Sequence, residues 1–313
     1  MSRLGRAVYY TVHQPRNFFL TLGRENGFPQ TFINRWNGAL MLRAARSLPP
    51  AAPANPSAKV RVCYLTGRRF WHLTAFTHAS LAKVAPHLAM PVFLSDGSLD
   101  ESLARRLTEL FPGAEIIDEA EIRESVERHL PAFSYPNLRR LREELPIARK
   151  LLDLHAGKSG WKLYLDSDAL FFRKPEFLES WADSPGNLYL SDVASSYAYS
   201  DKLLASLLGQ PILPRVNAGM IGLCSEKIDF EKLEYWTSWF YRDRPVSWLT
   251  EQCLTAMLMT LQGGTSAPSS DYIVSPIQTE AQSPKAVFHH YCGGSRRFLY
   301  SNGWKNVLKL LSS

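Results

Sequence analysis

Short apolar runs and helix-forming segments alternate along the first half of this 313-residue chain. The run before Gly67 is rich in β-branched and aromatic residues, which favour strands, and the segment after it has no Gly or Pro until Pro86, as a helix requires. We predict strands at 59–66, 91–94 and 114–117, and helices at 71–84, 99–110, 119–129 and 138–155. This order is typical of a largely parallel sheet with helices on both faces, where ligands bind beyond the carboxyl ends of the strands.

The pattern becomes more mixed after residue 186. We predict strands at 187–193, 215–224 and 285–290, and helices at 202–208, 226–241, 248–261 and 303–311. The chain is therefore expected to have a nucleotide-binding α/β half followed by a half that could hold a second substrate.

The apolar run 161–172 is interrupted by Asp166-Ser167-Asp168. Side chains at positions i and i+2 of a strand point the same way, so the two carboxylates lie close together and repel each other. A hard divalent cation with oxygen ligands removes that repulsion. The alternative is a turn after a buried strand with two solvated aspartates, but the apolar flanks indicate a rigid sheet and favour a metal site.

Four blocks of sequence follow one another along the chain: PIARKLLDLHAGKSGWKLYLDSD at 146–168, VNAGMIGL at 216–223, EQCLTAML at 251–258 and HYCGGSR at 290–296. They resemble the motifs of GT-A-fold glycosyltransferases, particularly the retaining family-eight type. The motifs of that type are an Ala-Arg before Tyr-Leu-Asp-x-Asp, an Asn-x-Gly strand, a helix opening with Asp-Gln, and His-[Phe/Tyr]-x-Gly-x-x-Lys. The resemblance covers residues 59–300 and implies an α/β GT-A fold, a Rossmann-like mixed sheet flanked by helices in a single catalytic domain.

The resemblance implies transfer of a sugar, a hexose, from a nucleotide-diphosphate donor, a UDP-sugar, with retention of configuration. The acceptor would be a glycan, a lipid-linked sugar or a small molecule. A divalent metal, Mn²⁺ or Mg²⁺, would neutralise the departing diphosphate. The expected metal ligands are Asp166, Asp168 and His290, where Asp166 contacts the metal, the ribose or both. His289 is the second choice for the nitrogen ligand, and a hydrogen-bonded core histidine is the alternative for His290.

The donor-binding residues are expected at strand ends, on the helix before the Asp-x-Asp strand, within the strand 215–224 and in the cationic loop after His290. They are Thr66, Gly67, Arg149, Asp166, Asn217, Gly293 and Arg296. Arg296 stands where the family has Lys, and an arginine can clamp a diphosphate with two parallel hydrogen bonds. A solvated helix position is the alternative for Arg149, and a structural bulge is the alternative for Asn217.

The catalytic candidates are Gln252, expected to face the anomeric carbon, and Glu251, expected to bind sugar hydroxyls beside it. Glu251 stands where the family usually has Asp. The alternative for this pair is a helix-capping arrangement after Ser247.

Charge is concentrated near the N-terminus. Residues 1–47 hold seven Arg, no Lys and one acid, Glu25, so their net charge is 7 − 1 = +6 of the total +7. Aromatic residues are interleaved with these arginines, a composition that suits an anionic membrane surface. The alternatives to a membrane-binding arm are a transit peptide and an ordinary extension packed on the main domain. Nucleic acid is not an expected partner, because no nucleic-acid-binding module accompanies the charge. We therefore expect a basic, aromatic-rich arm at 1–46, a Pro/Ala-rich linker at 47–58 and a catalytic domain at 59–313.

No apolar run approaches the roughly 18 residues of a membrane span, and the N-terminus lacks the apolar core of a secretory signal. The four cysteines are far apart, without the spacing of a zinc cluster or a redox pair. We expect a cytoplasmic protein with reduced thiols, peripheral at the inner face of the membrane.

Two rival functions remain. Haloacid-dehalogenase-like phosphatases also place Asp-x-Asp after an apolar strand, but Leu170 stands where such enzymes have Thr or Val, and no later Gly-Asp-x-x-x-Asp follows. The second rival is a non-catalytic carbohydrate-binding or scaffold protein on a degenerate transferase fold.

Overall fold

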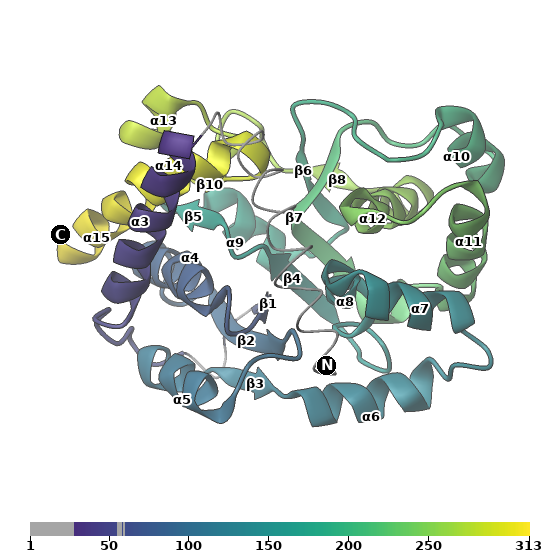
Figure 1. The fold of residues 1–313 in the computed structure, drawn as a ribbon, viewed down its shortest axis with the longest axis horizontal. Helices are drawn as coiled ribbons and strands as arrows, with labels where there is room; N and C mark the ends of the chain where they lie inside the picture. Colours follow the sequence, from purple (N-terminus) through teal and green to yellow (C-terminus); the bar gives the residue numbers. More distant parts are fainter. Residues whose placement is uncertain (1–27, 55–57, 59) are drawn as a thin grey trace.

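The computed structural model describes residues 28–54, 58 and 60–313. At its centre is a seven-stranded sheet with the order β3-β2-β1-β4-β7-β6-β8 (Figure 1). The strands are β1 (Val60–Thr66), β2 (Ala89–Ser95), β3 (Glu115–Ile117), β4 (Trp161–Leu165), β6 (Leu188–Ser191), β7 (Val216–Cys224) and β8 (Thr265–Ser266). Strands β1 to β4 are parallel to one another, whereas β7 is antiparallel to both β4 and β6. The predicted mixed α/β sheet is confirmed.

The helices lie on both faces of this sheet (Figure 1). The longer ones are α3 (Phe28–Ala45), α4 (Trp71–Val84), α5 (Glu101–Leu110), α6 (Glu119–His129), α7 (Pro136–Glu144), α9 (Glu176–Asp183), α10 (Asp201–Leu208), α11 (Phe230–Asp243), α12 (Trp248–Gln262) and α15 (Trp304–Ser312). The short ones are η2 (Pro146–Ala148), α8 (Arg149–Leu152), η3 (Ser225–Lys227), α13 (Gln278–Gln282), η4 (Gly293–Ser295), α14 (Arg296–Phe298) and the π-helical turn η5 (Leu299–Gly303). Helices α4 and α6 have the predicted bounds.

The single helix predicted at 138–155 is wrong. The chain forms α7, leaves helical geometry at Leu145, where φ is −129°, and then continues through η2 into α8. Pro146 explains the break, because proline lacks a backbone N–H and disfavours helical geometry in the residue before it.

A second sheet has three strands in the order β5-β10-β9, namely β5 (Ala169–Phe171), β10 (Phe288–His290) and β9 (Tyr272–Val274). The apolar run 161–172 is therefore divided between the two sheets, since β4 belongs to the first and β5 to the second. The Asp-x-Asp tripeptide is the connection between them.

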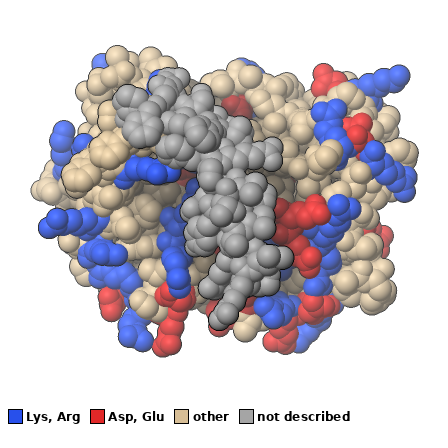
Figure 2. Space-filling view, in the orientation of Figure 1, with Lys and Arg blue, Asp and Glu red and all other residues tan. Residues whose placement is uncertain are grey.

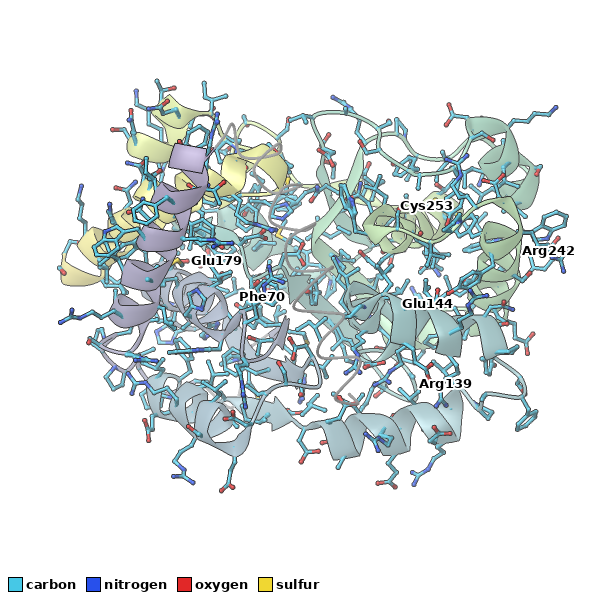
Figure 3. The ribbon with its side chains drawn as sticks, in the orientation of Figure 1. Phe70, Arg139, Glu144, Glu179, Arg242 and Cys253 are labelled. Carbon is cyan, nitrogen blue, oxygen red and sulfur yellow. The ribbon has the colours of Figure 1, made fainter. Side chains whose placement is uncertain are left out.

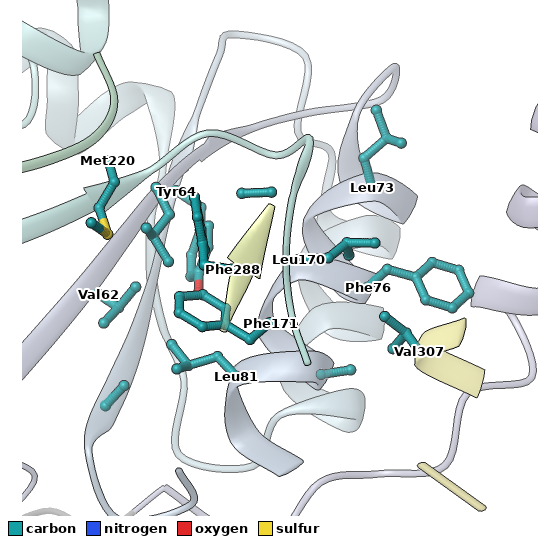
Figure 4. Packing of buried hydrophobic residues seen from close by; sticks show 14 of the residues in the cluster. Val62, Tyr64, Leu73, Phe76, Leu81, Leu170, Phe171, Met220, Phe288 and Val307 are labelled. Atoms are coloured by element: carbon teal, nitrogen blue, oxygen red, sulfur yellow. The ribbon is translucent and has the colours of Figure 1, made fainter. Parts of the chain in front are cut away.

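Two hydrophobic clusters pack against opposite faces of the large sheet. Val62 and Tyr64 of β1 belong to the cluster that also holds Phe76 of α4 and Phe288 of β10, as Figure 4 shows, whereas Cys63 belongs to the other. Successive strand residues point to opposite faces, which explains this alternation. Buried residues of α7 and α11 belong to the second cluster. The two helices are also joined at the surface, where Glu144 accepts a 3.1 Å hydrogen bond from the Tyr241 hydroxyl. Figure 3 labels Glu144 and Arg242, which follows Tyr241.

Helix α3 packs on the same core as the rest of the chain. Met41, Ala45 and Leu48 are buried in the first cluster, so this core extends across the boundary predicted at 47–58. Residues 1–27, 55–57 and 59, which include most of the expected arm and part of the linker, lie outside the described residues. Within the described part of the chain, no helix has the length and apolarity to cross a membrane.

Candidate active site

Three side chains with the chemistry of metal ligands meet where β4 ends. Asp166 follows β4, Asp168 precedes β5, and His290 is the last residue of β10. One ligand atom from each lies within 4.8 Å of the others. Nε2 of His290 is 3.5 Å from Oδ2 of Asp166 and 3.3 Å from Oδ1 of Asp168. The structure thus brings together the three residues that the sequence analysis expected as ligands.

Three hydrogen bonds to or from the backbone of the Asp-x-Asp tripeptide hold it in place. The N–H of Asp166 donates to the carbonyl of Gly219 on β7 at 2.8 Å, and the N–H of Tyr291 donates to the carbonyl of Asp168 at 2.8 Å. The hydroxyl of Thr77 on α4 donates to the carbonyl of the residue between the two aspartates, also at 2.8 Å. Because both sheets and a helix hold this segment, the backbone that carries the two carboxylates is fixed from three directions.

The imidazole of His290 lies directly against the backbone of β7. A Cβ atom added to Gly219 would be 2.2 Å from Cε1 of His290, so only glycine leaves room for the ring. Asn217 organises this part of β7, because its Oδ1 accepts a 3.0 Å hydrogen bond from the N–H of Gly219 and its Nδ2 donates to Asp192 at 3.0 Å. Asn217 was expected to bind a sugar hydroxyl; in this structure both ends of its amide hold the protein together.

His289 faces the opposite side of β10 from His290, as adjacent strand residues do. Its Nδ1 lies 3.2 Å from the Tyr291 hydroxyl and its ring packs against Phe172 at a centroid distance of 5.1 Å. Burial lowers the pKa of His289 to about 4, so the ring is neutral near pH 7. Of the two histidines, only His290 lies beside the carboxylates.

The sequence analysis missed Lys150, a buried cation beside the carboxylates. Its Nζ is 3.5 Å from Oδ1 of Asp166, 3.0 Å from Oε2 of Glu251 and 2.8 Å from the carbonyl of Ala218, to which it donates. The hydroxyl of Tyr164 also donates to Asp166, at 3.0 Å. The Ala-Arg dipeptide that resembles the glycosyltransferase motif ends at Arg149, so it pointed to the residue next to Lys150 and not to Lys150 itself.

Arg149 instead lies beyond the ends of β2 and β3. Its Nη1 is 2.8 Å from Oε2 of Glu119, its Nε is 3.9 Å from Asp153, and Nη1 is 3.4 Å from where a Cβ would lie on Gly97. It therefore borders the strand ends at which the donor nucleotide was expected, whereas Lys150 takes the place next to Asp166.

Glu251 and Gln252 are buried in the first turns of α12. The capping box of this helix pairs Ser247 with Thr250, so Glu251 is not a capping residue. Its Oε1 accepts a 2.9 Å hydrogen bond from Thr255, and its Oε2 pairs with Lys150. Nε2 of Gln252 donates to the carbonyl of Ser196 at 3.2 Å, which connects the helix to the loop after β6.

Charges of opposite sign alternate through the site. Burial opposes ionisation of Asp166, but the charges of Lys150 and His290 outweigh it and lower the pKa of the carboxyl. Asp168 is also buried, yet Arg296 and His290 hold its pKa well below the usual range. Burial raises the pKa of Glu251, against the effect of the Lys150 charge. The two aspartates are thus anionic at neutral pH, as ligands of a divalent cation must be.

Arg296 extends from the start of α14 to Asp168. Its Nε is 3.0 Å from Oδ2 of Asp168, and its Nη2 contacts the same oxygen, while half of the side chain remains exposed. The arginine was expected to bind diphosphate; here it lies at the rim of the carboxylate cluster, from which its exposed part can reach a ligand. Gly293, at the start of this loop, has φ +54°, a conformation that favours glycine.

Thr66 and Gly67 end β1 beside the loop after β2. The hydroxyl of Thr66 is buried and lies 2.8 Å from that of Thr74. A Cβ on Gly67 would be 1.9 Å from Oδ1 of Asp96, so glycine allows the two strand ends to approach. These positions shape the sheet edge through packing and close backbone approach.

Comparison with known proteins identifies the fold. No protein-family model and no curated protein matches the sequence. Among solved structures, mouse xyloside xylosyltransferase 1 in its apo form matches with TM-score 0.50 and 12% identity over 76% of this chain and 97% of that chain. The galactosyltransferase LgtC, in complex with donor and acceptor sugar analogs, matches with TM-score 0.50 and 15% identity over 81% and 95% of the respective chains. At these identities the likeness shows the fold, which is that of the GT-A class.

Proposed function

For this GT-A-fold chain, we propose a metal-dependent glycosyltransferase activity that moves a hexose from a UDP-sugar to an acceptor with retention of configuration. The observation that carries the proposal is the convergence of Asp166, Asp168 and His290 within 4.8 Å at the end of β4. In an open α/β sheet, the carboxyl ends of the parallel strands are where a nucleotide ligand binds.

The donor set fits Mn²⁺ or Mg²⁺. It offers carboxylate oxygens, which hard cations prefer, and one imidazole nitrogen, which manganese accepts readily. Nε2 of His290 faces both carboxylates, while its Nδ1 is buried and lacks a hydrogen-bond partner among the described residues. The ring is therefore held by packing against Gly219, and a cation would take the place of the proton that Nε2 carries in the charged form of His290. A bound cation would supply positive charge to the departing diphosphate.

The protein's own cations would assist at the same place. Arg296 is half exposed at the rim and would bind the diphosphate with its guanidinium, exchanging part of its contact with Asp168 for phosphate oxygens. Lys150 is fully buried between Asp166 and Glu251 and would hold both carboxylates in their orientation. We assign Lys150 a positioning role and Arg296 a donor-binding role.

Glu251 and Gln252 are the proposed contacts to the transferred sugar. Gln252 would face the anomeric carbon, and its amide is oriented by the hydrogen bond to Ser196. Glu251 would accept hydrogen bonds from sugar hydroxyls while Lys150 and Thr255 hold its carboxylate. Arg149, Thr66 and Gly67 border the region proposed for the nucleotide.

The proposed location is the cytoplasm, at the inner face of the membrane. All four cysteines are free, which suits a reducing compartment. A glycan, a lipid-linked sugar or a small molecule is the proposed acceptor.

A thermal-shift screen of nucleotide sugars, each with and without MnCl₂, tests the proposal. Ligand at 100 times its Kd stabilises the native state by about 2.7 kcal/mol, so the true donor should raise the Tm by several degrees only when manganese is present. The Asp168→Asn variant is the control and should show no shift. The selected donor is then incubated with candidate acceptors, and release of UDP together with a glycosylated product is measured. Phosphate release without transfer would indicate a phosphatase, and stabilisation by no donor would contradict the proposal.

A further inference from the structure

Acidic residues are absent from two long segments of the sequence. Residues 26–95 hold eight Lys or Arg and no Asp or Glu, and residues 281–313 hold five Lys or Arg and no Asp or Glu. Of the 29 acids in the chain, 28 lie between residues 96 and 280. The molecule's charge asymmetry therefore involves much more of the chain than its N-terminal residues.

The fold packs the helices of these two segments against one another on one side of the molecule. Helices α3 and α4 come from the first segment, and η5 and α15 come from the second. Trp304 of α15 packs on Phe76 of α4 with ring centroids 5.9 Å apart, and Gly38 of α3 lies against the ring of Tyr300 in η5. Figure 2 shows Lys and Arg side chains with few Asp or Glu over the α3 and α15 side, at left, whereas the right half and the lower edge carry side chains of both signs.

Large apolar side chains project from α3, which belongs to the first acid-free segment. Phe32, Trp36 and Leu40 repeat every four residues on α3, which puts them on one face of the helix. Phe32 is 63% exposed, Trp36 62% and Leu40 37%, and the adjacent Ile33 is 46% exposed. We call Phe32, Ile33, Trp36 and Leu40 the α3 ridge. Exposed cations accompany it on the same side of the molecule, namely Arg43 and Arg46 after the ridge and Lys305 and Lys309 on α15.

We propose that the α3 ridge and these cations form a docking surface for an anionic lipid membrane. Aromatic rings on a helix lying in the interface insert at the headgroup level, while Lys and Arg meet the lipid phosphates. Neither α3 nor α15 carries an acid, so the helices that present these side chains hold no charge that anionic lipid would repel. A nucleic acid duplex would use the cations but offers no apolar layer for four neighbouring apolar side chains. The bases of a single strand stack on aromatic rings but not on the aliphatic Ile33 and Leu40. This proposal is independent of sugar transfer.

The position of the surface also bears on the acceptor. Helix α3 packs on η5, and η5 follows α14, which begins with Arg296. The docking surface and the cationic loop of the active site are therefore joined through adjacent short elements. A membrane held by α3 would be connected to the loop that borders the metal cluster, an arrangement that suits an acceptor at the membrane.

Vesicle cosedimentation of the full-length protein tests the proposal. Wild type should bind phosphatidylcholine vesicles containing 30% phosphatidylglycerol, bind pure phosphatidylcholine weakly, and lose most of its binding at 0.5 M NaCl, where charges are strongly screened. The double variant Phe32→Ser/Trp36→Ser should bind anionic vesicles at least tenfold more weakly. Trp248→Ser is the matched control, since Trp248 is 63% exposed but lies on α12, and it should bind as wild type does.

A second pair of variants separates charge from apolar contact. Arg43→Gln and Lys309→Gln should each weaken binding to anionic vesicles about fivefold, corresponding to roughly 1 kcal/mol per cation near the surface. The Tm of every variant is measured without vesicles to establish that each is folded. Unchanged binding by the double variant, or equal binding of wild type to neutral and anionic vesicles, would overturn the proposal. Size-exclusion chromatography adds a further outcome: a wild-type dimer that the double variant converts to a monomer would make the ridge an interface between two copies of the chain.

Discussion

Gly219 and His290 are in such close contact that a Cβ on the glycine would lie 2.2 Å from Cε1 of the histidine. The contact joins β7 of the large sheet to β10 of the small one. It places the imidazole at a fixed distance from the carboxylates of Asp166 and Asp168. The Asn-x-Gly segment of β7 therefore has a direct physical connection to the proposed metal site.

We expect Gly219→Ala to displace the His290 ring and weaken Mn²⁺ binding at least tenfold, as changes that disturb the orientation of a metal ligand do, about 10–100-fold. The new methyl group should also destabilise the protein by about 1–3 kcal/mol through overpacking. Calorimetry with MnCl₂ and urea unfolding measure the two effects. Gly186→Ala is the control, because a Cβ there meets no atom within 4 Å. Wild-type manganese affinity in Gly219→Ala would contradict the role given to this contact.

Lys150 should be essential for stability as well as for the site. Lys150→Met leaves the buried Glu251 without its cation and removes one of the two cations beside Asp166, and breaking such a buried pair costs about 3–5 kcal/mol. Urea unfolding of Lys150→Met, Glu251→Gln and the double variant forms a double-mutant cycle. The double variant should recover part of the loss, because the uncompensated Glu251 charge is removed. Strictly additive losses would show that the two residues do not interact.

The fold was predictable where local signals agree with the final structure. The predicted bounds of helices α4 and α6 agree with the structure to the residue. Helix α4 lacks Gly and Pro and ends before Pro86. Helix α6 begins after Asp118, whose side chain caps it by accepting hydrogen bonds from the N–H groups of Ala120 and Glu121. Helix α3 was missed because apolar residues lie on both its buried and its exposed faces, so it shows no clear amphipathic pattern. Strand β9 has three residues, too few for a recognisable period.

The sequence predicted those site residues that are polar or charged within an otherwise apolar segment. Two aspartates inside an apolar run, and a histidine at the end of an apolar strand, stand out in the sequence. Lys150 does not, because a lysine next to an arginine in a helical segment is normally solvent-exposed. Its burial depends on Glu251, which lies far away in the sequence and comes close only in the folded chain.

Arg296→Ala should distinguish phosphate binding from nucleoside binding. A hydrogen bond to a charged group is worth about 1.5–3 kcal/mol, so the loss of the guanidinium should weaken UDP binding by roughly 10–150-fold. Uridine lacks the diphosphate, so its binding should change little. Competition binding with both ligands in the presence of Mn²⁺ measures the difference. Equal losses for UDP and uridine would remove Arg296 from the phosphate site.

Stability should fall in mild acid because buried histidines resist protonation. Burial lowers the pKa of His78 and of His155 to about 3, whereas an unfolded histidine has a pKa of about 6.5. Between these values the unfolded chain binds protons that the folded one does not, so the free energy of unfolding decreases as pH falls from about 6.5 toward 3.

Each of these histidines contributes about 1.4 kcal/mol per pH unit within that window. Urea unfolding at several pH values between 6 and 4.5 measures the slope, and His78→Gln should reduce it by about 1.4 kcal/mol per pH unit. A variant with the wild-type slope would show that His78 is protonated in the folded protein as readily as in the unfolded one.

The most direct test of the central claim is calorimetric titration of UDP into the wild type and into Asp168→Asn, each with and without Mn²⁺. The account predicts that manganese strengthens UDP binding to the wild type at least tenfold and has no effect on the variant, while the Tm of the two unliganded proteins shows that both are folded. UDP binding to the wild type that does not depend on manganese, or equal manganese dependence in Asp168→Asn, would contradict a metal site at Asp166, Asp168 and His290.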